Sequence, residues 1–178
     1  MHTSPDHPAD RGPFDSFRRD HASVLERIDE LERRTLAAAG PDEATLREAV
    51  AMLERQFATH MAAEDSVLYP ALQAAFPAGR TTLETLRADH AELRAMLRVL
   101  PVWIDAPASA SRDEQLQVVL RDFIDLLRLH IHREESAMFD VASRVLSPSE
   151  AEELARRVAP LVDSNPPGGT GPGPAKGT

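Results

Sequence analysis

The sequence of 178 residues contains no cysteine. This absence excludes disulfide bonds, thiolate nucleophiles, cysteine-ligated zinc fingers and iron-sulfur clusters. The chain is also short of positive charge, with 20 basic against 29 acidic residues and a formal net charge of -9. Such a surface repels phosphate backbones and anionic lipids, so we expect neither nucleic acid nor a membrane surface as a partner.

Long apolar runs are missing as well. No stretch approaches the roughly 20 residues of a membrane span, and residues 1–13 are polar and lack the apolar run of a signal peptide. We therefore expect a soluble, cytoplasmic protein. The hydrophobic content of 42% is enough for one sizeable core. We expect one domain over residues 14–162, between a disordered arm at 1–13 and a disordered, Gly- and Pro-rich tail at 163–178.

Proline and glycine are clustered, and they divide the chain into long segments rich in Ala, Leu, Arg and Glu, which favour helices. Because apolar and polar residues hardly alternate, strands are not expected. Thr81, Ser111 and Ser147 each precede a glutamate by three residues and predict capping boxes. Pro70 and Pro101 should each kink a helix or end it early. The fold class is all-α, with four long helices and a short fifth one over residues 15–39, 42–75, 82–104, 112–146 and 148–161.

Steps of three and four residues along each long helix give a row that should face the core of a bundle. These rows are apolar, and in the second and fourth helices they extend to Val67, Ala137 and Val141. Burying an unpaired polar side chain costs about 1–3 kcal/mol, and a carboxylate more. Only histidine and glutamate interrupt the rows, at His21, His60, Glu64, His90, His130 and Glu134.

The depth of these interruptions along a bundle follows from the positions of the turns. In an antiparallel hairpin, residues equidistant from the turn lie at the same level. The midpoints between consecutive histidines fall at residues 40–41, 75 and 110, each in or next to a predicted turn. All four histidines should therefore share one layer, and each glutamate lies one helical turn after a histidine on the same face.

The pattern is also duplicated. Asp20-His21-Ala22 recurs as Asp89-His90-Ala91, and the segment that begins at His60 recurs at His130, 70 residues later. Two hairpins related by a pseudo-two-fold axis would make a symmetric site for two metal ions. Each ion would take two imidazoles, and the two carboxylates could bridge them. Iron, manganese and zinc all tolerate this ligand set.

Two alternatives to this site follow from the residues. The six polar side chains could satisfy one another by hydrogen bonds, without a cation. A ferritin-like dimetal site is disfavoured, because it needs Glu-x-x-His on two helices and no histidine in this chain has a glutamate three residues before it.

The combined motif resembles the hemerythrin-like HHE cation-binding domains over about residues 14–146. The resemblance rests on the four histidines and two glutamates, on the Asp-His pairs, and on the aromatic residues Tyr69 and Phe139, five residues after each glutamate. It implies an up-down-up-down four-helix bundle and a non-haem, oxo- or hydroxo-bridged di-iron site that reacts with oxygen species. It also implies the metal ligands: His21 and His60 for one iron, His90 and His130 for the other, and Glu64 and Glu134 as bridges.

The chain departs from the oxygen-carrying members of that family. They have a second histidine on the third helix, one turn from the first, where this chain has Leu86 and Arg94. They also have an aspartate five residues after the last histidine, where this chain has Glu134 at four. These differences imply open coordination positions on both metals and disfavour reversible oxygen carriage. Arg94 could neutralise a bridging carboxylate or be an ordinary flanking charge.

The function expected from this pattern is the binding or turnover of a small oxidant such as dioxygen, peroxide or nitric oxide. Whether the chain is an enzyme stays open; an enzymatic version would decompose peroxide or act as an oxidase at the metal pair. A second class is a sensor or interaction module, read by an unknown protein partner. A third class is a redox-inactive metal-binding protein, loaded with zinc or storing iron.

Four further residues are weighed against simpler structural roles. His132 lies about 200° around the helix from His130 and should face solvent. Asp20 and Asp89 could support ligand histidines, but their place one residue before His21 and His90 favours side chains that point away and improve the charge near the helix start. For Tyr69, a buried aromatic that fills the end of the row is favoured over a hydrogen-bonding role.

Overall fold

The computed structural model describes residues 14–35 and 43–162, and every element in these ranges is helical. The predicted all-α class is confirmed. The arm at 1–13, the tail at 163–178 and the last residues of the first predicted helix lie outside the described residues. Within the described part, no helix has both the length and the apolar content that a membrane span requires.

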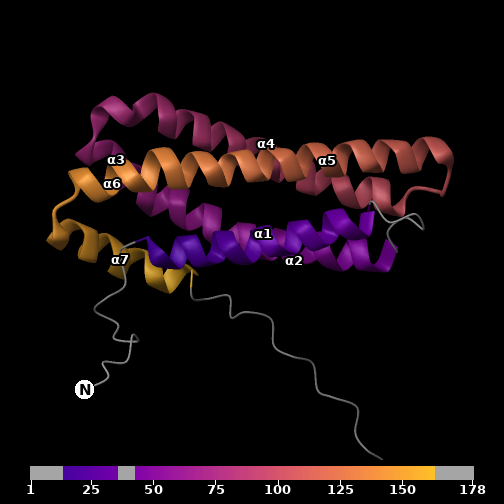
Figure 1. The fold of residues 1–178 in the computed structure, drawn as a ribbon, viewed down its shortest axis with the longest axis horizontal. Coiled ribbons are helices and arrows are strands. Elements are labelled where there is room, and N and C mark those ends of the chain that lie inside the picture. The colour runs from indigo at the N-terminus through magenta and orange to yellow at the C-terminus, as the bar shows by residue number, and fades with distance from the viewer. Residues whose placement is uncertain (1–13, 36–42, 163–178) are drawn as a thin grey trace, which may run out of the picture.

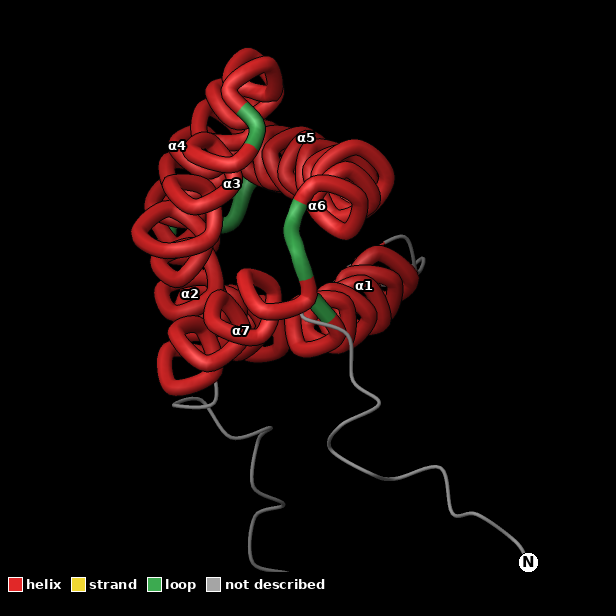
Figure 2. Tube along the Cα trace, turned by 90° about the vertical axis from the view of Figure 1, so that its left-hand side faces the viewer, coloured by secondary structure: helices red, strands yellow, loops and turns green. Residues whose placement is uncertain are grey.

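Four long helical segments form a bundle. They are α1 (Asp15–Thr35), α2 (Glu43–Ala63) with its continuation α3 (Tyr69–Ala75), α4 (Arg80–Asp105), and α5 (Ala110–Arg133) with its continuation α6 (Asp140–Val145). The segments run along the long axis of the molecule, and short connections reverse the direction of the chain (Figure 1). Seen from one end, α1 and α4 each lie between α2 and α5, which closes a ring around a common core (Figure 2).

The core consists of two hydrophobic clusters at different depths of the bundle. The first cluster includes Val24, Phe57, Leu93 and Leu127, and the second includes Phe17, Ala63, Leu86 and Met138. In each long segment, one of the four predicted histidines stands between a residue of the first cluster and a residue of the second. The predicted polar layer therefore separates two apolar cores.

Two π-helical turns, at Glu64–Leu68 and Glu134–Phe139, interrupt what the sequence predicts as continuous α-helix. In the first turn, the Tyr69 backbone N–H donates to the Glu64 carbonyl, five residues back. Such a turn holds one extra residue, so the buried row changes register after each glutamate. The predicted core position Ala137 is wrong because its side chain is exposed, and Val67 and Val141 are only half-buried. The residues that are buried in their place are Leu68, Tyr69, Met138, Phe139 and Ala142.

Neither proline ends its helix early. Pro70 stands at the start of α3, directly after the first π turn, and the helix continues to Ala75. Pro101 lies inside α4, which continues one turn further to Asp105, where buried Leu100 and Ile104 hold the helix against the core. Proline is not the shared cause of the π turns, because Asp140 stands at the position equivalent to Pro70 after the second one.

One of the three predicted capping boxes is present. The Ser147 backbone N–H donates to Glu150 Oε2 at 2.8 Å, and the Glu150 N–H points back to Ser147 Oγ at 3.4 Å. The box at Ser111 is wrong, because Ser109 caps α5 and accepts from the Arg112 N–H. The box at Thr81 is wrong as well, because α4 already begins at Arg80, after the short 3-10 turn Pro77–Gly79.

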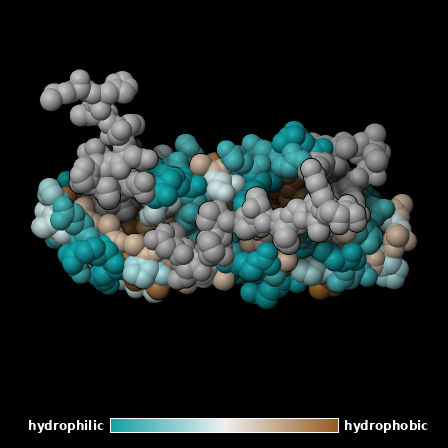
Figure 3. All heavy atoms as spheres, turned by 90° about the horizontal axis from the view of Figure 1, so that it is seen from below, coloured by the Kyte–Doolittle hydropathy of each residue, from teal (hydrophilic) through white to brown (hydrophobic). Residues whose placement is uncertain are grey.

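The short fifth helix, α7 (Pro148–Val162), packs across one end of the bundle. Its apolar side chains Leu154 and Val158 are buried in the second cluster, and the helix contacts α2 and the first π turn. From below, where α1, α2 and α7 lie, hydrophilic residues predominate and hydrophobic ones show mainly in recesses between them (Figure 3). α7 therefore completes the apolar core beneath the polar layer.

Candidate metal centre

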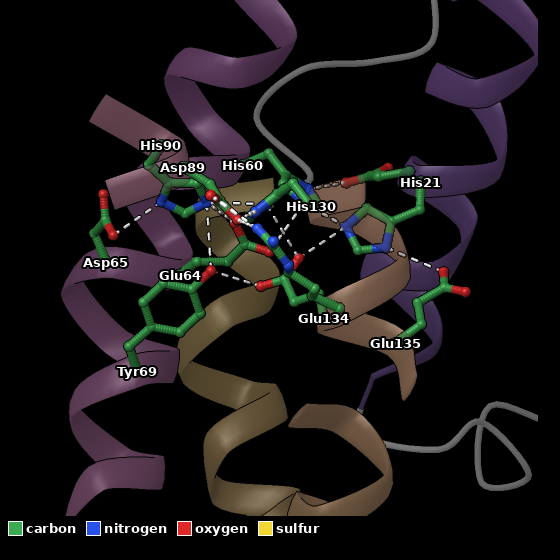
Figure 4. A network of polar contacts seen from close by, with 12 residues as sticks. His21, His60, Glu64, Asp65, Tyr69, Asp89, His90, His130, Glu134 and Glu135 are labelled. Atoms are coloured by element: carbon green, nitrogen blue, oxygen red, sulfur yellow. Dashed lines mark hydrogen bonds and ion pairs between the residues drawn. The ribbon is translucent and has the colours of Figure 1, made fainter. Parts of the chain in front are cut away.

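The structure brings all six residues predicted as metal ligands into one buried layer (Figure 4). None of their side chains is more than 8% exposed, and those of Glu64, His90 and Glu134 are completely enclosed. Each long segment contributes one histidine, and both glutamates stand at the first residue of a π turn.

The four histidines form two pairs that face each other through their Nε2 atoms. His21 Nε2 lies 3.0 Å from His60 Nε2, and His90 Nε2 lies 3.2 Å from His130 Nε2. When two ligand atoms bind one ion with bonds of about 2.0–2.2 Å and an angle of about 90° between these bonds, the two atoms are about 3 Å apart. Each pair therefore has the spacing of two ligands on a shared cation.

The two glutamates connect the pairs. Glu64 Oε1 lies 3.0 Å from His60 Nε2, and its Oε2 lies 3.3 Å from His90 Nε2. Glu134 Oε2 lies 3.2 Å from His21 Nε2 and 3.6 Å from His130 Nε2. Since each carboxylate reaches one histidine of each pair, it can bridge two ions.

The donor set fits a pair of cations better than it fits a closed hydrogen-bond network. Both oxygens of Glu64 and Oε2 of Glu134 are buried and have no hydrogen-bond partner of acceptable geometry. Leaving buried carboxylate oxygens unsatisfied is costly unless a cation binds them. Potential ligand atoms within 4.8 Å of one another form two groups, one of His21, His60, Glu64 and Glu134, the other of Glu64, His90 and His130.

A carboxylate also stands behind each histidine, at the Nδ1 atom that points away from the centre. Asp20 accepts from His60 Nδ1 at 3.3 Å, Asp65 from His90 Nδ1 at 3.0 Å, and Glu135 from His21 Nδ1 at 3.1 Å. Asp89 lies 3.7 Å from His130 Nδ1, too far for a hydrogen bond. Metal-bound imidazoles usually donate their other N–H in this way, which fixes the ring and raises its basicity.

These supporting carboxylates correct the prediction for Asp20 and Asp89. Both turn toward the histidine of the neighbouring helix and not away from the site. Sequence reasoning missed Asp65 and Glu135 entirely. A signal was available, because each directly follows one of the two glutamates and they are 70 residues apart, the offset of the internal repeat.

Arginines bind two of the four supporting carboxylates. Arg94 donates to Asp65 Oδ2 at 2.9 Å, and Arg133 donates to both oxygens of Asp89 at 2.9 and 3.1 Å. Arg94 thus does not pair with Glu64 or Glu134, and of the two predicted roles the flanking charge fits, with Asp65 as its partner. Both arginines belong to the His90–His130 half.

Tyr69 is fully buried, as expected of an aromatic at the end of the row, but it also hydrogen-bonds inside the centre. Its hydroxyl donates to Glu134 Oε1 at 2.7 Å and lies 3.3 Å from His90 Nε2. In an α-helix, a residue five places after Glu64 would point about 140° away from it. The π turn brings Tyr69 back to the same face.

The carboxylates decide the protonation of the layer. Burial opposes protonation of His60, but the nearby Glu64 and Asp20 carboxylates outweigh it and raise the pKa of His60 to about 10. Burial likewise opposes protonation of His90, while Asp65 and Glu64 raise its pKa to about 9. Burial and repulsion from His90 lower the pKa of His130 to about 3. The layer thus binds positive charge strongly, as protons or as metal cations.

Two features define the surroundings of the centre. The side chain of His132 is exposed, as predicted, although it stands only two residues from His130. A small recess lined by Asp20, His21 and His60, with Gln56 and His130, opens beside the layer and holds about one water-sized molecule.

Comparison with known proteins agrees with this geometry. The family model described as the Hemerythrin HHE cation binding domain matches residues 6–142, which is most of the chain. The match includes all six candidate ligands and ends before α7. A search of curated proteins gave no match.

Proposed function

We propose that this chain, which belongs to the hemerythrin HHE cation-binding family, holds two iron ions in its buried layer and uses them to react with a small oxidant. The observation that carries the proposal is the two pairs of facing histidines on either side of two buried carboxylates, three of whose four oxygens lack a hydrogen-bond partner. His21 and His60 would hold one ion and His90 and His130 the other, with Glu64 and Glu134 shared between them.

When bound, an iron pair supplies redox chemistry with dioxygen, peroxide or nitric oxide, and the protein supplies the enclosure. Two apolar clusters exclude water above and below the layer. The supporting carboxylates hold the imidazoles in place. The recess beside His21 and His60 has room for a molecule of about the size of water, which favours a small oxidant over a bulky substrate.

Metal analysis combined with an absorption spectrum tests the proposal. The purified chain should contain two irons, show an oxo-to-iron charge-transfer band in the near ultraviolet, and release oxygen rapidly from added peroxide. A colourless protein loaded with zinc would contradict it and favour the redox-inactive class. Two irons without any reaction with peroxide would favour the sensor class.

Two histidines on the same helix provide a matched pair of variants. His130→Ala should cost at least one metal per chain, because its Nε2 faces the centre, whereas exposed His132→Ala should leave the metal content unchanged. Metals per chain measured in both variants decide the assignment. Loss of metal in His132→Ala with retention in His130→Ala would refute it.

A further inference from the structure

The internal symmetry of the centre is broken at one aromatic residue. Tyr69 and Phe139 hold equivalent places in the repeat, each five residues after a bridging glutamate. The Tyr69 ring is stacked on the His90 ring, with 5.5 Å between centroids, and the Phe139 ring is stacked on the His21 ring at 5.8 Å. Only the His90–His130 half therefore has a phenol oxygen beside its histidines.

That oxygen lies where a ligand of the same ion would lie. Tyr69 Oη is 3.3 Å from His90 Nε2, the nitrogen that also faces His130 Nε2 at 3.2 Å and Glu64 Oε2 at 3.3 Å. These three separations are close to the roughly 3 Å expected between neighbouring ligands of one cation. The side chain is completely buried, and Figure 4 shows it directed at the centre beside Glu64 and Glu134.

The distribution of charge also distinguishes the two halves of the centre. The carboxylates behind His90 and His130 are each bound by an arginine, Arg94 and Arg133. Among the described residues, no arginine lies within 4.0 Å of Asp20 or Glu135, which stand behind the other two histidines. Arg94, one turn after His90, cannot be a metal ligand, because a guanidinium has no lone pair to give to a cation. Because these arginines neutralise Asp65 and Asp89, the His90–His130 half carries less net negative charge behind its histidines than the other half does.

We propose that Tyr69 is a ligand of the metal ion held by His90 and His130 and that it binds as a phenolate. The proposal rests on the proposed metal centre. When the ion binds, the phenol O–H bond breaks, the oxygen lone pair goes to the metal, and the proton leaves to solvent. No electron is transferred. The two metal positions are then chemically different, with Tyr69 on one ion and the apolar ring of Phe139 beside the other.

The composition of the chain makes this proposal testable in the unmodified protein. Tyr69 is the only tyrosine, and there is no cysteine, so a phenolate or thiolate band cannot arise elsewhere. The oxidised, iron-loaded chain should show a phenolate-to-iron charge-transfer band in the visible and tyrosinate ring modes in its resonance Raman spectrum. A protein with two ferric ions per chain and neither signature would overturn the proposal and leave Tyr69 as a hydrogen-bond donor to Glu134.

Tyr69→Phe is the matched variant, because it copies the residue that stands at position 139 in the other half. It should lose the visible band and the tyrosinate modes. If this variant binds no iron, the test rests on the wild type alone. Its tyrosinate Raman modes can come only from Tyr69, the single tyrosine of the chain. A visible band of unchanged intensity in an iron-loaded Tyr69→Phe protein would contradict the proposal.

Loading with Zn²⁺ separates this proposal from the proposed iron chemistry. Zinc binding should produce the near-ultraviolet difference spectrum of tyrosine ionisation in the wild type, and Tyr69→Phe should lack it. If the wild type binds no iron but shows this difference spectrum, the proposed function fails and the ligand assignment stands. Stoichiometric zinc binding without it refutes the ligand assignment.

Discussion

The histidine rings of the centre are oriented by acidic residues that are not themselves candidate ligands. Asp20 reaches His60 across the interface between α1 and α2, and Glu135 reaches His21 across the interface between α1 and the second π turn. An imidazole with such a carboxylate at Nδ1 keeps Nε2 free for a metal. The orientation of the ligands therefore depends on packing between helices as well as on the ligand residues.

Asp20→Asn should lower the metal affinity of the chain about 10- to 100-fold, the usual effect of removing a carboxylate behind a metal-bound histidine. The hydrogen bond to His60 Nδ1 would weaken, while the charge of the surface would change by one unit. Glu26→Gln is the control, because it makes the same charge change at an exposed position of α1. Affinity is measured by competition with a chelating dye, and equal affinities in both variants would contradict the role of Asp20.

The six candidate ligands could be predicted from the sequence, because they are the only interruptions of apolar rows and they recur at a constant offset. The roles of Asp65, Glu135 and Tyr69 could not be predicted from the same periodicity. Their orientation depends on the register of the backbone after Glu64 and Glu134, and a strict α-helical period gives the wrong register there.

Among the elements of the fold, the two π turns have the largest effect on the centre. Each begins at one of the two buried glutamates of the layer and ends at or next to the aromatic residue that stacks on a histidine. A single extra residue in a turn leaves no trace in composition, so the sequence predicts uninterrupted α-helices. The repeated spacing from glutamate to aromatic residue was the one local sign of the change in register.

Two alanines, one inside the second π turn and one after it, provide a test of this register. An α-helical row predicts Ala137 in the core, whereas the structure exposes Ala137 and buries Ala142 to 1% exposure. Ala142→Asp should reduce the free energy of unfolding by about 3 kcal/mol or more, because it buries an unpaired carboxylate. Ala137→Asp should change it by less than about 0.5 kcal/mol. Chemical denaturation of both variants checks this, and the reverse order would restore the α-helical register.

Arg112, at the start of α5, makes long-range contacts that the sequence pattern does not predict. Arg112 is buried at 8% exposure and donates to the Trp103 carbonyl at 2.9 Å and to Glu43 Oε1 at 2.6 Å. It thereby ties the end of α4 and the start of α5 to the start of α2. No periodic pattern marks this arginine, because its partners are two backbone carbonyls, the carboxylate of the adjacent Asp113 and a carboxylate 69 residues away. Within the described residues, and apart from the two π turns, the bounds of the helices agree with the predicted ones to within a few residues.

In the molecule as a whole, the polar layer lies between the two apolar clusters of the described bundle. Each long segment passes from one cluster to the other through a residue of the layer. Any unsatisfied charge in the layer therefore acts on the stability of both clusters. Protons on the histidines and bound metal cations both neutralise the buried carboxylates, so both change the free energy of unfolding.

Without metal, the stability of the chain should be highest near pH 6.5. The pKa values of His60 and His90 are raised to about 10 and about 9, so the stabilisation from their protonated forms is complete below about pH 6.5 and is lost as the pH rises through those values. The pKa of His130 is lowered to about 3, so stability also falls as the pH drops below about 6.5 and the unfolded chain takes up that proton.

Bound cations replace the protons of the layer, so metal should stabilise the chain most at high pH and least in acid, where imidazole protonation releases it. At a free metal concentration of about 100 times Kd the expected stabilisation is about 2.7 kcal/mol, or about 5–10 °C in Tm for a chain of this length. Calorimetry of metal-free and metal-loaded protein between pH 5 and pH 9 measures both curves. His132→Ala should leave them unchanged, because its exposed ring lies outside the layer. Equal Tm values for the two forms at pH 9 would mean that the six residues satisfy one another without a cation, and the assignment of the layer as a metal centre would then fail.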